Sequence, residues 1–178
     1  LAQEIVTASS QIPHEVIGKK LEILGSSLVT DPRISAVLAN ILQEDCYLYS
    51  NRDKNEVLRL RAFGFAVLAK IGVPITTVPQ IVAELSYAHK AYPYASAARA
   101  AGMVKGYESI FVPLLLRAFT PQIMDDEMSL ERYDPDFPPP ERTTARVEAL
   151  RALGKFGDKA MASVAVLTEV INDNKISE

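Results

Sequence analysis

The densest group of reactive side chains in the sequence is a run of carboxylates between residues 125 and 141. Its seven members are Asp125, Asp126, Glu127, Glu131, Asp134, Asp136 and Glu141. Clustered carboxylates suit Ca²⁺, but their spacing here departs from the EF-hand loop, and the run lacks the glycine that turns such a loop. We therefore expect no metal site in this run.

The same run is rich in proline, with Pro135 and Pro138 to Pro140 in the stretch YDPDFPPPE. Proline prevents helix and biases the preceding residue to an extended backbone. Such a stiff segment can hold Tyr133 and Phe137 against the protein's own surface or present them to a partner. Docking against the protein's own surface is the favoured interpretation, and both residues are kept as candidate partner-binding residues.

Histidine, cysteine and serine offer little further chemistry. Cys46 is the single cysteine, so it forms no internal disulfide, and it is predicted to be a small buried residue. His14-Glu15 is read as a polar pair in the first turn of a helix in preference to a metal ligand pair, and His89 has no plausible serine partner. The sequence has no CxxC, HExxH, GxSxG, P-loop or GxGxxG motif. We expect no catalytic residue, no cofactor and no metal.

Composition narrows the class of protein. The 178 residues are 48% hydrophobic and 23% charged, which is typical of a globular chain. The net charge is −3, and 19 basic residues are scattered evenly among 22 acidic ones, which argues against a dominant nucleic-acid surface. No apolar run reaches the roughly 18 residues that span a bilayer, which predicts a soluble protein without membrane insertion. The cytoplasm is favoured, and an exported form stays open because a signal peptide could have preceded Leu1.

Three segments repeat in one frame, set by Gly72, Gly106 and Gly157. The residue eight positions earlier is small in each copy, and small residues let two helices cross closely; these residues are Gly64, Ala98 and Ala149. A weaker fourth copy has Pro32 in place of the glycine. The four anchors are 40, 34 and 51 residues apart, and such periods are typical of helical solenoids. The excess in the last spacing falls at 120–142.

Each copy is predicted to be a pair of helices. In 145–156 the apolar stripe comprises Ala145, Ala149, Ala152, Leu153 and Phe156, and the outward residues are Arg146, Glu148, Arg151 and Lys155. Gly157 is expected to end this helix in a left-handed conformation. The following helix should turn Met161, Val164, Leu167 and Ile171 inward. Asp31 and Thr77 are predicted helix N-caps, residues 1–10 an additional helix, and the tail from 172 to 178 a frayed end.

The segments ARVEALRALGKFGDKAMASVAVL (145–167) and ASAARAAGMVKGYESIFVPLL (95–115) resemble the HEAT-like repeats of bacterial proteins, a group that includes the phycobilin-lyase-type repeats. The resemblance covers most of residues 17 to 173. We therefore predict an all-α fold, a right-handed α-solenoid of about four HEAT-like helical hairpins. The repeats are placed at roughly 17–45, 54–88, 94–120 and 143–173, with an insertion at 120–142, in a single domain or part of a longer array.

The resemblance implies a function in binding, because such repeats serve chiefly as scaffolds for other macromolecules. The predicted function is a non-catalytic protein–protein interaction scaffold whose partner is another protein. The alternative is an enzyme on the same solenoid, similar to a bilin lyase or a DNA-repair glycosylase. HEAT-type deoxyhypusine hydroxylases bind two irons through several His-Glu dyads, and only His14-Glu15 has that form here. HEAT-like glycosylases use a basic concave face and tryptophan, and this sequence contains no Trp.

Two surfaces are candidate partner sites. One is a tyrosine-rich stretch at 86–107 that includes Tyr92 and Tyr94, although packing of these rings at the repeat interface is the favoured interpretation. The other is the concave face, which we expect the second helix of each pair to line. Its predicted solvent-facing residues are Gln80, Glu84, Arg117 and Glu169.

Overall fold

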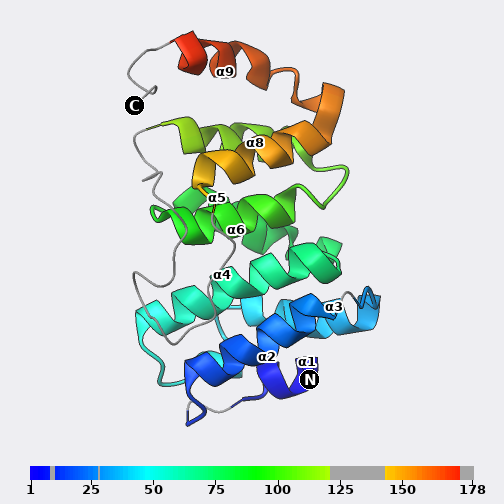
Figure 1. Cartoon of the computed structure of the whole chain (residues 1–178), viewed down its shortest axis with the longest axis vertical. Helices are drawn as coiled ribbons and strands as arrows, with labels where there is room; N and C mark the ends of the chain where they lie inside the picture. Colours follow the sequence, from blue (N-terminus) through cyan, green and yellow to red (C-terminus); the bar gives the residue numbers. More distant parts are fainter. Residues whose placement is uncertain (9–10, 28, 121–142, 173–178) are drawn as a thin grey trace.

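A computed structural model describes residues 1–8, 11–27, 29–120 and 143–172, and the predicted Tyr133 and Phe137 lie outside these ranges. Within them the chain is all-helical and contains no strand, which confirms the predicted all-α class. Figure 1 shows an elongated stack of helices with Ala2–Val6 (α1) at one end and Ser163–Asn172 (α9) at the other. No helix in the described ranges is long and apolar enough to cross a bilayer.

The helices form two layers. The first layer contains four helices, each packed against the next: α2 (His14–Ser26), α4 (Lys54–Ile71), α6 (Ala91–Ala101) and α8 (Ala145–Phe156). The second layer contains α1 (Ala2–Val6), α3 (Pro32–Leu38), α5 (Val78–Tyr87), α7 (Glu108–Leu115) and α9 (Ser163–Asn172). Short 3-10 helices join them: η1 (Ala39–Leu42), η2 (Tyr47–Tyr49), η3 (Ile75–Thr77), η4 (Leu116–Phe119) and η6 (Gly157–Ala160).

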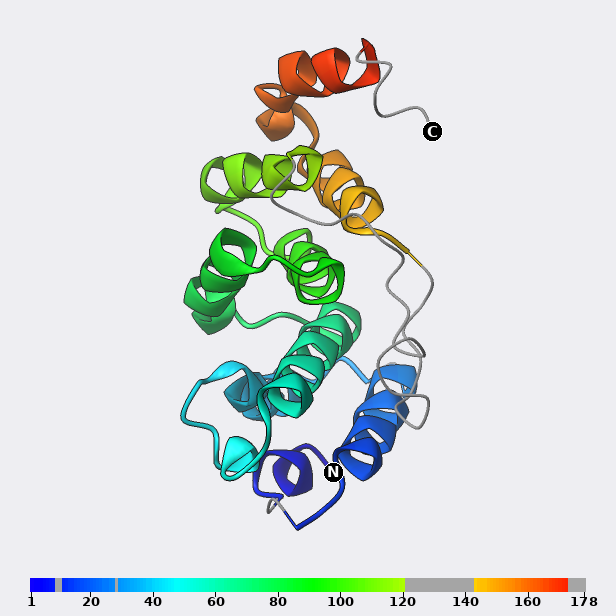
Figure 2. The same cartoon turned by 90° about the vertical axis from the view of Figure 1, so that its left-hand side faces the viewer.

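The stack is bowed, and Figure 2 shows the first layer along the inner side of the bend. We call the side of α2, α4, α6 and α8 that is turned away from the second layer the inner face. The prediction that the second helix of each pair lines the concave side is therefore wrong. A physical reason lies in α6, where the buried residues Ala95, Ala97 and Ala98 are small and let neighbouring first-layer helices approach closely.

Capping side chains fix where several helices begin. The Asp31 carboxylate accepts a hydrogen bond from the Arg33 N–H (2.8 Å) at the start of α3, which confirms the predicted cap. The Thr144 hydroxyl accepts one from the Val147 N–H (3.2 Å) at the start of α8. Thr77 was predicted to cap α5 in the same way, and this is wrong, because its hydroxyl donates backwards to the Pro74 carbonyl (2.7 Å).

The three anchor glycines share a backbone conformation that side chains disfavour. Gly72, Gly106 and Gly157 have φ values of 121°, 90° and 55°, and they are the described glycines with positive φ. Gly72 and Gly157 directly follow α4 and α8, which confirms the predicted end of α8 at Gly157. Gly106 instead lies in the connection after α6, which ends at Ala101. The repeated glycines therefore mark the turns between paired helices.

The turn at Gly106 is held by Glu108, the first residue of α7. The Glu108 carboxylate accepts hydrogen bonds from the Gly106 N–H (3.1 Å) and from Lys159 Nζ (3.1 Å) on η6. Backbone hydrogen bonds, first that from Gly106, and then Lys159 lower the pKa of Glu108 from 4.5 to about 2. This carboxylate joins the turn before α7 to the connection after α8.

The lowered pKa of Glu108 predicts a loss of stability in acid. Because the folded-state pKa lies below the ordinary value, the stabilising contribution is present above about pH 4.5 and is lost as the pH falls toward 2. Glu108→Gln should therefore make urea unfolding midpoints less dependent on pH between about 4.5 and 2. Glu22→Gln, at an exposed position of α2, is the control and should leave the pH dependence as in the wild type. An unchanged slope in Glu108→Gln would contradict the assignment.

The last helix departs from its predicted orientation. Met161, Val164 and Ile171 were expected to point inward, but their exposed fractions are 63%, 50% and 79%, and Leu167 is half-buried. The reason is that α9 packs chiefly on η4 and has little else against its apolar side in the described part of the chain. The additional helix expected within residues 1–10 is confirmed as α1.

Candidate functional site: a basic groove across three helices

The inner face carries an open groove of about 360 Å³ where α4, α6 and α8 lie side by side. Its lining comprises Ala66, Ala69 and Lys70 of α4, Arg99 of α6, and Glu148, Arg151, Ala152 and Lys155 of α8. The groove exists because residues 95–101 of α6 are small apart from Arg99, and α6 is buried along most of its length. Gly102, just after α6, lets the backbone at the end of α6 approach the backbone of α8 closely, since a Cβ added there would lie 3.0 Å from the Ala152 Cα.

The charge of the groove is opposite to that of the whole chain. Among the described residues its lining holds four cationic side chains and one carboxylate, a net charge of +3, whereas the whole chain carries −3. Lys70, Arg99 and Lys155 each belong to the last turn of their helix, where a cation interacts favourably with the negative end of the helix dipole. Three helices thus bring their C-terminal cations to one place.

Glu148 lies in the floor of the groove and is 2% exposed, so the prediction that it faces outward is wrong. Its carboxylate accepts hydrogen bonds from Arg99 on α6 (Nε 2.9 Å, Nη2 3.2 Å), from the Thr143 hydroxyl (2.7 Å) and from Arg151 (2.6 Å). The position faces α6 and not solvent, because α8 is covered by helices on two sides. The ion pair between Glu148 and Arg99 ties α8 to α6.

The electrostatics of Glu148 keep it ionised. Burial acts to raise the pKa of this carboxyl, but the hydrogen bonds from Arg99, Thr143 and Arg151 outweigh burial, so the pKa is lowered. A carboxylate with four donor contacts and a lowered pKa is a poor general base. Its role in the groove is to orient the two guanidinium groups.

A second cleft of about 360 Å³ opens between α4, α5 and the start of α6. Its apolar lining is formed by Leu58, Ala83, Ala88 and Pro93, and its polar lining by Glu44, Arg61, Glu84, Tyr87, His89 and Lys90. Arg61 Nη2 lies 3.3 Å from the Glu84 carboxylate, yet burial raises the pKa of Glu84. Tyr87 at the rim is 78% exposed. This cleft brings the predicted residue Glu84 together with Tyr87 and His89.

The two tyrosines named as partner-binding candidates are core residues. Tyr92 is 4% exposed and Tyr94 is fully buried, so neither can meet a partner. This agrees with the favoured interpretation, in which the rings pack the repeat interface. The Tyr94 hydroxyl lies 2.7 Å from the Leu114 carbonyl and 2.9 Å from that of Leu115, whereas the buried Tyr92 hydroxyl has no hydrogen-bond partner among the described residues.

Removing the Tyr92 hydroxyl and removing the Tyr94 hydroxyl should change the free energy of unfolding differently. Tyr92→Phe is expected to leave the free energy of unfolding unchanged or raise it by about 1 kcal/mol, because it removes a buried polar group without a partner. Tyr94→Phe should lower it by about 1 kcal/mol, because a satisfied hydrogen bond to α7 is lost. Urea titration of both variants measures the difference. Equal losses in the two variants would show that the Tyr92 hydroxyl is satisfied in solution.

The remaining predicted site residues are spread over the second layer. The Gln80 amide donates to Gln43 Oε1 (3.1 Å), and Arg117 on η4 donates to the Leu85 carbonyl. Glu169 on α9 is exposed. Gln80 and Glu84 lie one turn apart on α5, and Arg117 contacts that helix at Leu85, whereas Glu169 lies on α9.

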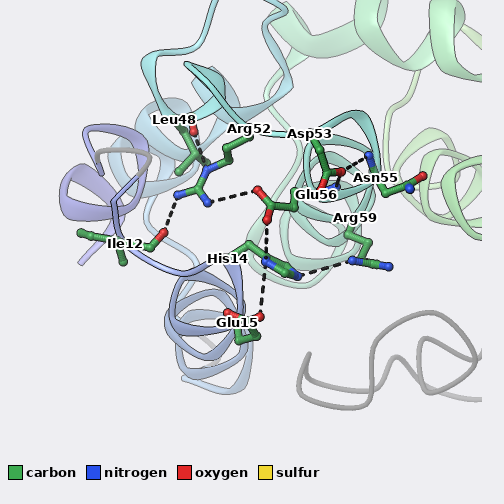
Figure 3. A network of polar contacts seen from close by, with 9 residues as sticks. All are labelled: Ile12, His14, Glu15, Leu48, Arg52, Asp53, Asn55, Glu56 and Arg59. Atoms are coloured by element: carbon green, nitrogen blue, oxygen red, sulfur yellow. Dashed lines mark hydrogen bonds and ion pairs between the residues drawn. The ribbon is translucent and has the colours of Figure 1, made fainter.

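His14 belongs to a polar network at the start of α2 and α4 (Figure 3). Its Nδ1 lies 3.5 Å from the Glu15 carboxylate and 3.3 Å from that of Glu56, and its Nε2 lies 3.4 Å from Arg59. Arg52, whose side chain is 2% exposed, donates to the carbonyls of Ile12 and Leu48, each at 2.7 Å. These contacts tie the segment before α2 to η2 and α4, so the network has a structural role.

Cys46 is half-buried, and burial raises the pKa of its thiol. Among the residues that the structure describes, no three His, Cys, Asp or Glu side chains are grouped so as to hold a metal ion. Comparison with protein families, with curated proteins and with solved structures finds no match for this chain.

Sequence reasoning missed the groove residues. A signal for two of them was present, since Lys70 and Lys155 each stand two positions before an anchor glycine. Such a shared frame position places side chains on equivalent faces of equivalent helices. Arg99 has no equivalent signal, because α6 ends five residues before Gly106, so the position two before that glycine lies outside the helix. Arg151 is on α8, and the residue at the same distance before Gly72 on α4 is Ala66, so the frame shows no shared cation there.

Proposed function

We propose that this chain is a HEAT-like repeat scaffold, a right-handed α-solenoid that binds another protein through its inner face and performs no catalysis. The observation that carries the proposal is the open groove lined by residues of α4, α6 and α8. A ligand that lies along it contacts three consecutive helix pairs at once. Repeat arrays commonly use the extended concave surface in this way.

The repeat frame supports the architecture in this proposal. Gly72, Gly106 and Gly157 adopt positive φ in the turns of the last three pairs, and the first-layer helices pack in chain order. The chemistry of the groove supports binding over catalysis. Its carboxylate is ionised and bound by Arg99, Thr143 and Arg151, so it has no spare basicity for proton transfer.

Site-specific photocrosslinking tests the proposal. A photoreactive residue replaces Ala69, which lines the groove, or Ala36 as the control, which is exposed on α3 in the second layer. We expect one protein to be captured through position 69 and not through position 36. That protein, purified, should bind the unmodified chain in a calorimetric titration.

Binding that persists when the groove charge is reversed would count against the proposal. The variant for this step carries Lys70→Glu and Lys155→Glu. Capture through both positions equally would place the interface elsewhere. A catalytic turnover measured for the chain with any captured partner would overturn the non-catalytic assignment.

A further inference from the structure

The lining of the groove combines an apolar floor with a cationic rim. Ala66, Ala69 and Ala152 provide short apolar side chains, and Lys70 and Lys155 are exposed beside them. Arg151 is also at the rim, with 61% of its side chain exposed. A ligand that fits these features has small apolar groups toward α6 and negative charge on either side.

We propose that the groove binds an acidic peptide segment supplied by another polypeptide. This inference rests on the proposed function and names the chemistry of the partner. Carboxylates of the segment would pair with Lys70, Arg151 and Lys155 at the rim, while its small side chains lie over the alanines. The orientation of Arg99 and Arg151 is set beforehand by Glu148, which reduces the entropy lost when a ligand binds.

The same charges fit a nucleic acid less well. The residues that line the groove in the described part of the chain are alanine, lysine, arginine and glutamate, with no aromatic ring on which a base could stack. The floor of the groove also holds the ionised Glu148 carboxylate, which disfavours the entry of a continuous phosphate backbone. Discrete carboxylates can reach the rim cations without approaching that region.

The rim cations lie at the surface, and this position sets how much they contribute to binding. Exposed charges act mainly on association and are screened by salt, with a Debye length of about 8 Å at physiological ionic strength. Reversing two rim lysines replaces attraction by repulsion. We expect this change to weaken binding by about tenfold or more.

Fluorescence anisotropy tests the inference with a labelled peptide of alternating Glu and Ala, about 12 residues long, which supplies both the carboxylates and the small side chains. The full chain should bind this peptide, and increasing NaCl should weaken binding. The matching Gln-Ala peptide should bind about tenfold more weakly or not at all. Equal binding of the two peptides would overturn the proposal.

Matched variants locate the binding site. Lys70→Glu with Lys155→Glu should weaken binding of the Glu-Ala peptide, whereas Lys19→Glu with Lys105→Glu should not. The control pair makes the same change in net charge at exposed positions outside the groove. If both pairs of substitutions weakened peptide binding equally, the effect would come from net charge alone, and the assignment of the binding site to the groove would be wrong. Circular dichroism confirms that each variant is folded.

Further measurements distinguish the acidic peptide from other possible ligands of the groove. Tighter binding of a single-stranded oligothymidylate than of the Glu-Ala peptide would overturn the proposal in favour of a nucleic acid. Replacing the seven carboxylates of 125–141 by amides should leave peptide affinity unchanged. A rise of about tenfold in peptide affinity would show that the chain's own acidic run competes for the groove. The ligand of the groove would then be that run and not a segment of another polypeptide. Capture of a protein without an acidic segment through Ala69 would refute the ligand chemistry but keep the scaffold function.

Discussion

Glu148→Gln is expected to lower the free energy of unfolding by about 3 kcal/mol, because removing one charged member of a buried ion pair is strongly destabilising. The Arg99 side chain is 12% exposed and the Glu148 side chain 2% exposed, and the two contact each other at 2.9 Å. Glutamine keeps the shape of the side chain but removes the charge. Thr143 and Arg151 also lose the anionic acceptor that they share. Urea titration at neutral pH, followed by circular dichroism, measures the loss.

A double variant separates the cost of removing one charge from the contribution of the whole ion pair to stability. Arg99→Met with Glu148→Leu should recover most of the stability lost in Glu148→Gln, because no buried charge remains. Glu169→Gln is the control at an exposed position of α9 and should change the free energy of unfolding by less than about 0.5 kcal/mol. If Glu148→Gln were as mild as this control, the pair would not tie α8 to α6.

The ion pair also explains why sequence periodicity predicted the position of α8 but not which of its polar residues are buried. The stripe from Ala145 to Phe156 predicted the helix, and α8 spans those residues. A period of 3.6 residues identifies one apolar face. Glu148 lies beside that face and points to α6, where Arg99 compensates its charge. Because compensation depends on a residue 49 positions away, it cannot be read from the helix alone.

Local backbone rules predicted more than side-chain patterns did. The cap at Asp31 and the end of α8 at Gly157 follow from nearby residues, and both are present. Exposure in α9 was predicted wrongly, because it depends on what packs on that helix and not on its own spacing. The groove depends on three helices together. Its cations Lys70, Arg99 and Lys155 are scattered in sequence, so composition alone suggested no basic surface.

Gly64→Ala is expected to destabilise the protein by about 2 kcal/mol, although alanine is the better helix former. Gly64 lies inside α4, where a new Cβ would be 2.6 Å from the Cγ2 of Ile41, a fully buried residue of η1. A methyl group on a β-branched side chain cannot move away without shifting the backbone. The helix propensity gained, about 1 kcal/mol, is therefore smaller than the packing energy lost. Urea titration gives the net change.

Gly154→Ala is the matched substitution, since Gly154 also lies inside a first-layer helix, but an added Cβ there meets no atom within 4 Å. With no steric cost, this variant should raise the free energy of unfolding by up to about 1 kcal/mol. The two variants make the same chemical change in equivalent helices, so opposite signs can arise only from close packing at Gly64. Stabilisation by both would mean that α4 and η1 do not approach closely, and the small residue eight positions before each anchor glycine would then have no structural explanation.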